Sequence, residues 1–130
     1  MNNKDIKIVV IGGGHAGVEA ALAISRMGKR CYMITMDTDS IGRMSCNPAI
    51  GGLAKGHLVR EIDALGGIMG EAADLTSIQF KTLNKSKGRA VWSPRAQVDK
   101  IKYSQFVRNA VVHDLNISII NDEVVDILVD

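Results

Sequence analysis

A glycine-rich turn near the start of the chain has the composition of a phosphate-binding site. An apolar run ending at Ile11 meets the sequence GGGHAG and then an alanine-rich segment. Glycine at Gly12 permits a tight turn, glycine at Gly14 lets the main chain approach a pyrophosphate, and Gly17 lets helix and strand pack closely. The N–H groups of the next helix point at the phosphates. The residues predicted to bind a dinucleotide are therefore Gly12, Gly13, Gly14, His15, Ala16 and Gly17.

Cys46 is a candidate nucleophile. It lies in the segment MSCNPAIGG, residues 44–52, a loop expected on the carboxyl side of a parallel sheet, where open α/β folds bind their ligands. Basic residues close by in sequence and a helix start after Gly52 would favour its thiolate. The alternative is a small buried apolar cysteine, a description that fits Cys31 well. No metal site can be assembled from the histidines, cysteines and acidic residues of the chain.

Two residues could accept a hydrogen bond from the ribose of the dinucleotide. An acidic residue about 20 residues past the glycines commonly has this role. Asp37 lies 20 residues after Gly17, whereas Thr35 stands where the second strand should finish. The run Asp37-Thr38-Asp39-Ser40 is equally well explained as an Asx-type turn.

The elements that would position the glycine turn form a strand–helix–strand unit. A continuous apolar strand over residues 7–11, of the kind buried on both faces, precedes a helix over residues 16–27. Gly28 ends this helix as a C-cap, and a second strand covers residues 31–35. The two strands are predicted to be parallel, and the helix that connects them then makes a right-handed crossover. This is the context in which the glycine motif predicts nucleotide binding.

The rest of the chain predicts a longer α/β arrangement. Residues 36–52 are rich in turn formers, and Gly66-Gly67 closes a helix over residues 53–65. Ser93-Pro94 is a typical helix start for a second long helix that ends near His113. The other predicted elements are a strand at 78–83, a basic turn at 84–88, and strands at 117–120 and 124–129 around the turn Asn121-Asp122.

Composition indicates an ordinary globular protein and one domain. The 130 residues are 46% hydrophobic and 23% charged, with a formal net charge of +2, which is too mild to indicate nucleic-acid binding by itself. The N-terminal apolar run is too short for a signal peptide, and no run reaches the roughly 20 residues of a membrane span. These features predict a cytoplasmic protein with reduced thiols and no membrane contact. A parallel sheet that stops directly after a strand indicates an N-terminal fragment.

Four segments together resemble the N-terminal part of the MnmG family, also called GidA, and the resemblance covers essentially all 130 residues. The Ser-Cys-Asn-Pro-Ala-Ile-Gly-Gly stretch is peculiar to that family among flavoproteins. The segments are residues 12–21, 45–52, 55–67 and 95–99. The implied fold class is α/β: a Rossmann-like FAD-binding domain with a parallel sheet and flanking helices, of which residues 1–130 are the incomplete N-terminal part.

The resemblance implies an FAD-dependent enzyme that modifies tRNA. With its partner GTPase MnmE, the family adds a carboxymethylaminomethyl or aminomethyl group to carbon five of the wobble uridine, using a folate one-carbon donor and NADH. Full members are several-fold longer and are homodimers. Their other parts carry the NADH-binding insertion, a second family cysteine and a helical domain that engages MnmE, so this fragment alone is expected to be inactive.

The resemblance also assigns site residues. Cys46 matches a family cysteine whose thiolate is proposed to add to carbon six of uracil, and Val124 falls where a strand residue offers backbone hydrogen bonds to the adenine. Two departures stand out. Arg89 replaces the proline of the family's Lys-Gly-Pro-Ala-Val, and no acid ends the second strand, which weakens the case for Asp37. The basic residues either face tRNA or flavin phosphates or form a solvated surface; they are Lys81, Lys85, Lys87, Arg89 and Arg95.

Three other functions are compatible with parts of the sequence. One is a generic flavin or nicotinamide oxidoreductase that acts on a small molecule. Another is the folate-dependent tRNA methyltransferase family TrmFO, against which the Ser-Cys-Asn-Pro segment argues. The third is non-enzymatic: a non-catalytic dinucleotide-binding module or a nonfunctional gene remnant.

Overall fold

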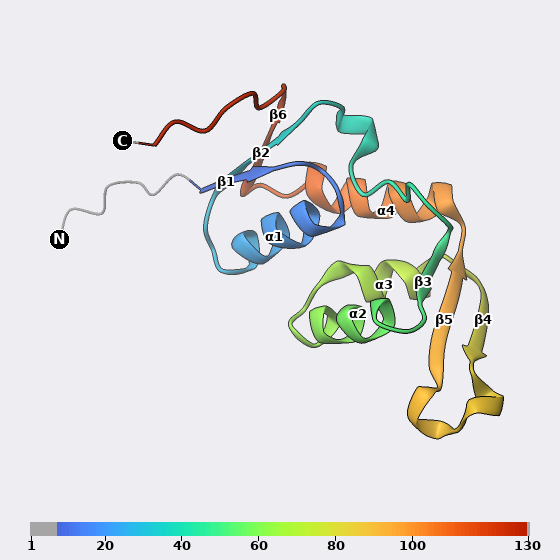
Figure 1. Ribbon diagram of the computed structural model, residues 1–130. Helices are drawn as coiled ribbons and strands as arrows, with labels where there is room; N and C mark the ends of the chain where they lie inside the picture. Colours follow the sequence, from blue (N-terminus) through green and yellow to red (C-terminus); the bar gives the residue numbers. More distant parts are fainter. Residues whose placement is uncertain (1–7, 130) are drawn as a thin grey trace. The chain divides into compact units, whose positions relative to one another are not determined.

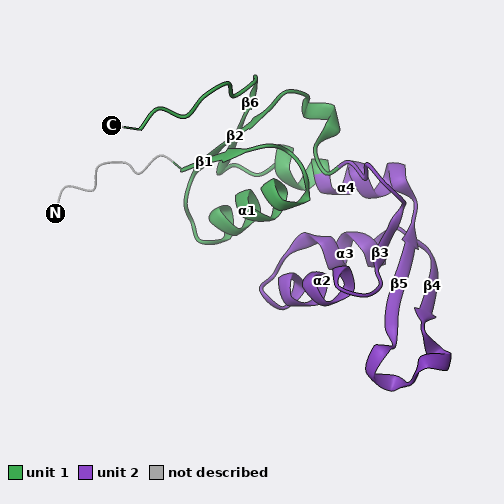
Figure 2. Cartoon of the chain, in the orientation of Figure 1, with its two compact units in different colours: residues 1–42, 108–130 green, residues 43–107 purple. Residues whose placement is uncertain are grey.

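The computed structural model describes residues 8–129, and it divides the chain into two compact units (Figures 1 and 2). The first unit contains the residues up to Gly42 together with those from Arg108 onward, and the second contains Arg43–Val107. Lys7, predicted to begin the first strand, lies outside the described residues. That all 130 residues belong to one FAD-binding domain stays a prediction.

The first unit is built on a three-stranded parallel sheet in the order β1-β2-β6. β1 (Ile8–Ile11) leads through α1 (His15–Arg26) to β2 (Cys31–Thr35), with Val10 opposite Met33. β6 (Ile117–Asn121) pairs with the other side of β2. The predicted strand–helix–strand unit is therefore confirmed, and so is the mixed α/β fold class with helices flanking a parallel sheet.

Gly28 ends α1 as predicted. Its φ of +69° belongs to the left-handed region, which favours glycine. The backbone N–H of Gly28 donates to Ser25 O at 2.8 Å, and that of Lys29 donates to Ile24 O at 3.1 Å. These bonds satisfy carbonyl groups that the end of a helix otherwise leaves without intrahelical partners.

The sheet of the first unit is buried on one face only. Residues of β1, β2 and β6 such as Val10, Met33 and Ile117 are buried on the same side as Val18 and Ala21 of α1. On the opposite face Val9 and Ile11 are about half exposed. The expectation that the first strand is buried on both faces is therefore wrong, because within the described residues this face lacks the covering layer that a parallel sheet ordinarily has.

The second unit has an antiparallel sheet that the sequence did not predict. β5 (Ser93–Val98) lies between β3 (Ala49–Gly51) and β4 (Ser77–Leu83). Two short helices, α2 (Lys55–Ala64) and α3 (Ile68–Leu75), pack against each other, α2 against β3 and α3 against β5. The predicted helix at 53–65 and strand at 78–83 are confirmed. β3 lies inside the predicted loop, and α3 was missed.

The predicted helix start at Ser93 is wrong. Ser93 and Pro94 begin β5, whose residues pair with β3 on one side and β4 on the other. The helix α4 begins later, at Lys100, and ends at Val112. The side chain of Asp99 caps it by accepting hydrogen bonds from the N–H groups of Ile101 and Lys102, at 3.0 and 3.1 Å. A serine–proline pair that fits a helix start thus belongs to a strand, because Leu83 and Thr82 of β4 pair with it.

The strand predicted over residues 124–129 is also not formed. These residues follow β6 without regular structure, and Val125, Leu128 and Val129 are almost fully exposed. In the part of the chain that the structure describes, no strand lies beside them to complete a ladder. An apolar segment at residues 124–129 was therefore not sufficient for a strand without a neighbouring strand to pair with. The same described residues contain no helix with the length and apolar character needed to cross a membrane.

Candidate functional site

The glycine turn joins β1 to α1 as the sequence predicts. Gly12 has a φ of +97°, a conformation that residues with a side chain rarely adopt. A Cβ atom on Gly17 would overlap the carbonyl oxygen of Gly12, so the first turn of α1 and the end of β1 approach too closely for any other residue. The backbone N–H of Gly12 also donates to Ile34 O at 2.8 Å, which ties the turn to β2.

Gly13 and Gly14 have different surroundings. A Cβ on buried Gly13 would lie 2.9 Å from Ile41 Cγ1 and 3.2 Å from Thr35 Oγ1, so packing within the protein explains this glycine. A Cβ on Gly14 would meet nothing within 4 Å, and its φ of −70° suits any residue. No protein atom among the described residues accounts for glycine at position 14, whereas a ligand lying against the backbone would.

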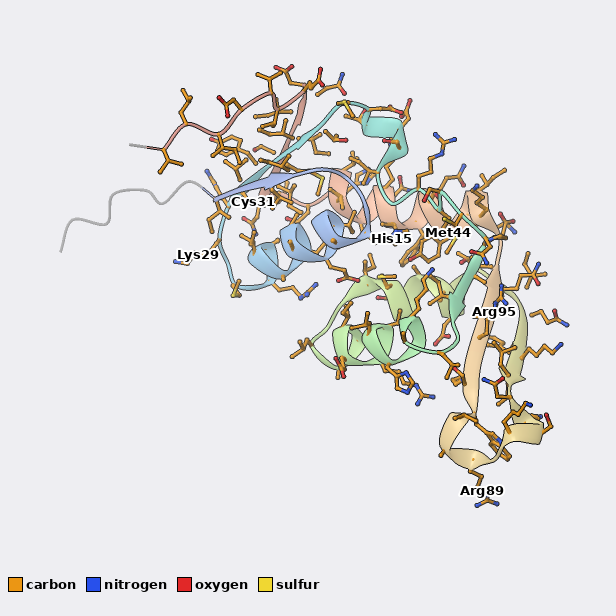
Figure 3. All side chains as sticks on the ribbon, viewed as in Figure 1. His15, Lys29, Cys31, Met44, Arg89 and Arg95 are labelled. Carbon is orange, nitrogen blue, oxygen red and sulfur yellow. The ribbon has the colours of Figure 1, made fainter. Side chains whose placement is uncertain are left out.

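The first turn of α1 is suited to an anion. Gly14 is the N-cap residue and has no side chain that could cap the helix, and the first turn contains no acidic residue. His15 and Ala16 are the first two residues of the helix, and Figure 3 shows His15 at this end. Backbone N–H groups and the helix dipole favour negative charge at such an end. The structure therefore brings Gly12 to Gly17 together in one turn that leads into an uncapped helix N-terminus.

The two candidate ribose ligands lie at the end of β2. Thr35 is buried, and its hydroxyl donates to Asp37 O at 3.3 Å. The Asp37 carboxylate accepts a hydrogen bond from Asp39 N at 2.9 Å and caps the short 3-10 helix η1 (Thr38–Ser40). The Asx-type turn is thus present at Asp37. Ribose binding by Thr35 or Asp37 stays a prediction.

Cys46 lies in the second unit, in the exposed loop before β3. The hydroxyl of Ser45 lies 4.0 Å from its sulfur and donates toward it. The ammonium group of Lys55, one of the nearby cations expected from the sequence, instead donates to Ala49 O at 3.1 Å. The thiol is therefore exposed to solvent; its role as a nucleophile stays a prediction.

Cys31 has the opposite environment. It is buried in β2, and its sulfur lies 4.0 Å from Ala21 O (Figure 3). Burial, and secondarily the negative charge of Asp114, raise the pKa of the Cys31 thiol above its ordinary value. A protonated, enclosed thiol is a core residue, as the sequence indicates.

Val124 is half-buried and follows β6. Contact between its backbone and an adenine stays a prediction. Within residues 8–129 no group of three or more His, Cys, Asp or Glu residues is gathered where it could hold a metal ion.

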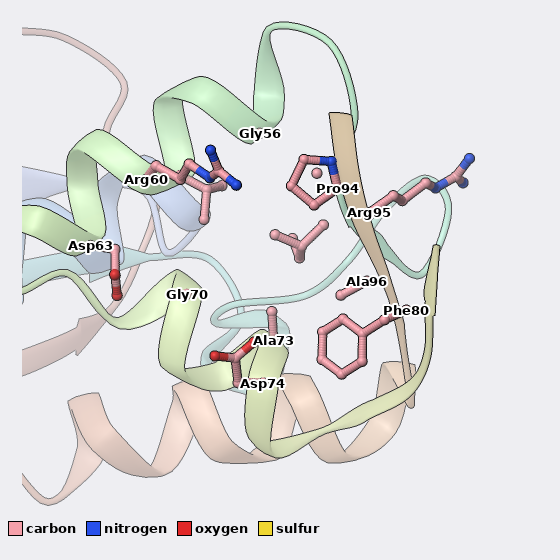
Figure 4. A pocket seen from close by; sticks show the side chains of 13 residues that line it. Gly56, Arg60, Asp63, Gly70, Ala73, Asp74, Phe80, Pro94, Arg95 and Ala96 are labelled. Carbon is pink, nitrogen blue, oxygen red and sulfur yellow. The ribbon is translucent and has the colours of Figure 1, made fainter. Parts of the chain in front are cut away.

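Sequence reasoning missed a cavity of about 320 Å³ in the second unit (Figure 4). The helices α2 and α3 form one wall, and Phe80 of β4 with Pro94 and Ala96 of β5 forms the other. Its charged lining residues are Arg60, Asp63, Asp74 and Arg95. The signal in the sequence was weak because the lining residues come from five elements, of which β3, α3 and β5 were not predicted.

These features define the class of protein. A glycine turn between the first strand and first helix of a parallel β-α-β unit, with an open helix N-terminus, is the dinucleotide-binding α/β fold. The sequence model of the family Glucose inhibited division protein A matches residues 7–130. The chain therefore belongs to the GidA family.

Similar proteins agree with this membership. The tRNA uridine 5-carboxymethylaminomethyl modification enzyme MnmG of Aquifex aeolicus is 58% identical over 125 residues, which are 96% of this chain and 20% of that protein. The MnmG of Chlorobaculum tepidum is 57% identical and matches over 92% of this chain and 19% of its own length. The chain thus spans about a fifth of the length of the curated relatives it matches.

Solved structures give the same result. The crystal structure of Aquifex aeolicus GidA, form I, superposes with a TM-score of 0.89 at 59% identity, over 95% of this chain and 21% of that one. The p-nitrophenol 4-monooxygenase PnpA of Pseudomonas putida superposes with a TM-score of 0.58 at 16% identity, over 95% of this chain and 34% of its own, which shows a shared fold.

Proposed function

We propose that this chain is the FAD-binding N-terminal portion of an enzyme that modifies the wobble uridine of tRNA at carbon five. The modification is the addition of a carboxymethylaminomethyl or aminomethyl group, as the name of the MnmG relatives indicates for the first of these groups. The tRNA part of the proposal rests on the MnmG relatives. The observation that carries its FAD part is Gly14, a glycine that no packing within the described residues requires, at the start of an uncapped helix. A pyrophosphate lying against that backbone explains it.

The residues present fit FAD. Gly12, Gly13, Gly14, His15, Ala16 and Gly17 would hold the pyrophosphate, and Val124 would meet the adenine through its backbone. When bound, FAD supplies a hydride donor or a carrier for a one-carbon unit. The turn is already shaped, since its φ angles and its hydrogen bond to Ile34 are set by the protein.

Cys46 is the proposed nucleophile. Its exposed thiolate adds to carbon six of uracil, and the electron pair of the C5–C6 double bond moves toward carbon five and the C4 carbonyl. Carbon five becomes enolate-like and attacks the methylene carbon of an iminium ion, formed by condensation of the one-carbon unit with an amine co-substrate: ammonia for the aminomethyl group and glycine for the carboxymethylaminomethyl group. Loss of the proton from carbon five and expulsion of the thiolate then restore the ring. This is covalent catalysis by a reversible addition.

The proposed partners follow from the family. They are tRNA, the GTPase MnmE, a folate one-carbon donor and NADH as reductant, in a homodimer that works in the cytoplasm. The 130 residues alone are expected to be inactive, because the relatives they match are about five times longer.

The test uses the full-length product of the gene that contains this chain. The purified protein should be yellow with flavin absorbance. With tRNA, MnmE and GTP, the folate donor, an amine co-substrate (ammonia or glycine) and NADH, it should form the modified uridine, measured by nucleoside mass spectrometry. Cys46→Ser should retain flavin and lose modification, whereas Cys31→Ala, the matched control, should retain both. Normal modification by Cys46→Ser would overturn the role of Cys46. A colourless protein that takes up only NAD would overturn the FAD assignment.

A further inference from the structure

The hairpin formed by β4 and β5 carries a strong positive charge. Its residues 77–98 include five basic side chains and no acidic one. A hollow of about 360 Å³ lies on this hairpin. We call its lining the hairpin surface; it consists of Phe80, Lys81, Thr82, Lys85, Pro94 and Arg95.

Two cations of the hairpin surface face each other directly. Lys81 and Arg95 are partners in the antiparallel register of β4 and β5. Like charges at directly opposite positions destabilise a sheet. In the part of the chain that the structure describes, neither side chain belongs to one of the salt bridges. The pair is therefore unfavourable for the folded protein by itself and becomes favourable when an anion lies between the two groups.

The space around this pair is open. On its other side Arg95 is paired with Gly51, which has no side chain to cover it. A Cβ on Gly51 would overlap Pro94 O, so glycine is required there. Figure 4 shows the Arg95 side chain pointing away from the cavity formed with α2 and α3. The guanidinium group is thus presented on the outer face of the sheet.

Aromatic side chains accompany the cations. Phe80 is 65% exposed and lines the hollow. At the tip of the hairpin the Trp92 indole N–H donates to Lys85 O at 3.2 Å, and the Arg89 guanidinium lies 5.8 Å from the Trp92 ring centre. Exposed aromatic rings beside cations are the groups that bind unstacked bases and phosphates of single-stranded nucleic acid.

We propose that the hairpin surface binds a single-stranded segment of the RNA substrate, with a phosphate between Lys81 and Arg95 and a base against Phe80. β4 is an edge strand of the sheet, so a chain along this edge reaches side chains of both faces. The proposal rests on the proposed function, since it assigns the surface that holds the tRNA. It requires no base-specific contact, so binding should be tolerant of sequence.

The test compares two charge-matched double variants of the full-length protein. Lys81→Gln/Arg95→Gln should weaken binding of an unmodified tRNA transcript at least tenfold. It should also reduce the slope of log Kobs against log salt concentration by about 0.7, as expected for loss of one neutralised phosphate of a single strand. Lys29→Gln/Arg30→Gln removes two exposed cations of the first unit and should bind like the wild type. Both variants should keep their flavin and their melting temperature.

Each outcome has a definite meaning. If the wild type modifies tRNA and the Lys81/Arg95 variant binds tRNA normally, the hairpin proposal is wrong and the proposed function stands. If the wild type makes no modified uridine but binds RNA in a way that depends on Lys81 and Arg95, the proposed function fails and the hairpin surface stands. Loss of flavin from the variant would assign these cations to the cofactor instead, and loss of RNA binding equally in the control variant would overturn the assignment to the hairpin.

A second measurement does not depend on substitution. Acetylation of lysines by a water-soluble reagent, followed by mass spectrometry, should show Lys81 and Lys85 protected when tRNA is bound and Lys29 unprotected. Equal modification of Lys81 with and without tRNA would contradict the proposal.

Discussion

The carbonyl oxygen of Gly13 accepts a hydrogen bond from the backbone N–H of Gly42 at 2.9 Å. Together with the bond from Gly12 N to Ile34 O, it holds the glycine turn on two sides. The turn therefore has its shape through the first unit itself, before any phosphate is present. A turn that is already ordered loses less conformational entropy when a ligand binds.

Alanine at Gly14 and at Gly17 should separate ligand binding from folding. Gly14→Ala places its Cβ in open space and should cost less than about 1 kcal/mol of stability, as expected for an N-cap position. Flavin binding should be lost, because the methyl group occupies the place of the phosphate. Gly17→Ala overlaps Gly12 O and should destabilise the fold by about 1–3 kcal/mol or more. Thermal melting and flavin absorbance of the full-length protein measure the two effects. A Gly14→Ala protein with full flavin content would contradict this interpretation.

The N-cap of α4 gives a second prediction. Asp99→Ala removes the acceptor of two backbone N–H groups and should lower the free energy of unfolding by about 1 kcal/mol, whereas Asp99→Asn, which can still cap, should change it by a few tenths. Urea unfolding of the three proteins makes the comparison. If Asp99→Ala were as stable as the wild type, Asp99 would not be the residue that caps the start of α4.

This helix illustrates where sequence reasoning failed. The local signals at Ser93 and Pro94 are those of a helix start, yet these residues join a strand whose partner Ala49–Gly51 lies more than 40 residues earlier in the chain. β3 itself has three residues, too few to show periodicity. Helix α3 contains Gly70 and follows two glycines. A Cβ at Gly70 would lie 2.7 Å from Asp63 Oδ1, a contact that only the tertiary structure creates, so the Asp63 side chain would have to move.

The first unit could be predicted because its signals are local. The glycine turn, the apolar strands and Gly28 each act within a few residues, and the β-α-β connection has one handedness. The candidate site divides in the same way: the turn over Gly12 to Gly17 was predicted from spacing, whereas the hairpin surface depends on the register that sets Lys81 opposite Arg95.

The two cysteines should differ in reactivity. Exposed Cys46 should react with iodoacetamide in the native protein, and buried Cys31 should react only after unfolding, with a rate at least a hundredfold lower under native conditions. Peptide mass spectrometry after timed quenching distinguishes the sites. Comparable native rates at the two positions would show that β2 opens readily.

The pH dependence of stability follows from Cys31. Its pKa is raised in the folded protein, so its contribution to stability is fully present below the pKa of the unfolded thiol, roughly 8.5. As the pH rises above that value the unfolded chain loses this proton first, and the contribution is lost up to the folded pKa. Wild type should thus lose stability relative to Cys31→Ala between neutral and alkaline pH. Parallel pH profiles for the two proteins would contradict the raised pKa.

The ion pair between Arg108 and Asp39 should contribute little as a charge pair. Arg108 Nη2 lies 2.8 Å from Asp39 Oδ1, but the Asp39 side chain is 84% exposed. Asp39→Asn should therefore cost less than about 0.5 kcal/mol. Arg108→Ala also removes the hydrogen bond from Nε to Thr38 O and should cost about 1–2 kcal/mol. Denaturant unfolding at low and high salt measures the loss of stability in each variant. The loss in Asp39→Asn should vanish at high salt, and the loss in Arg108→Ala should remain.

The acid-free hairpin makes the charge of the molecule strongly uneven. The formal net charge of the whole chain is +2 while residues 77–98 carry +5, so the remaining residues carry a net charge of −3. Under the hairpin proposal, the positive charge concentrated in residues 77–98 would attract a polyanion before contact is made. The resulting increase in the association rate would fall steeply with ionic strength.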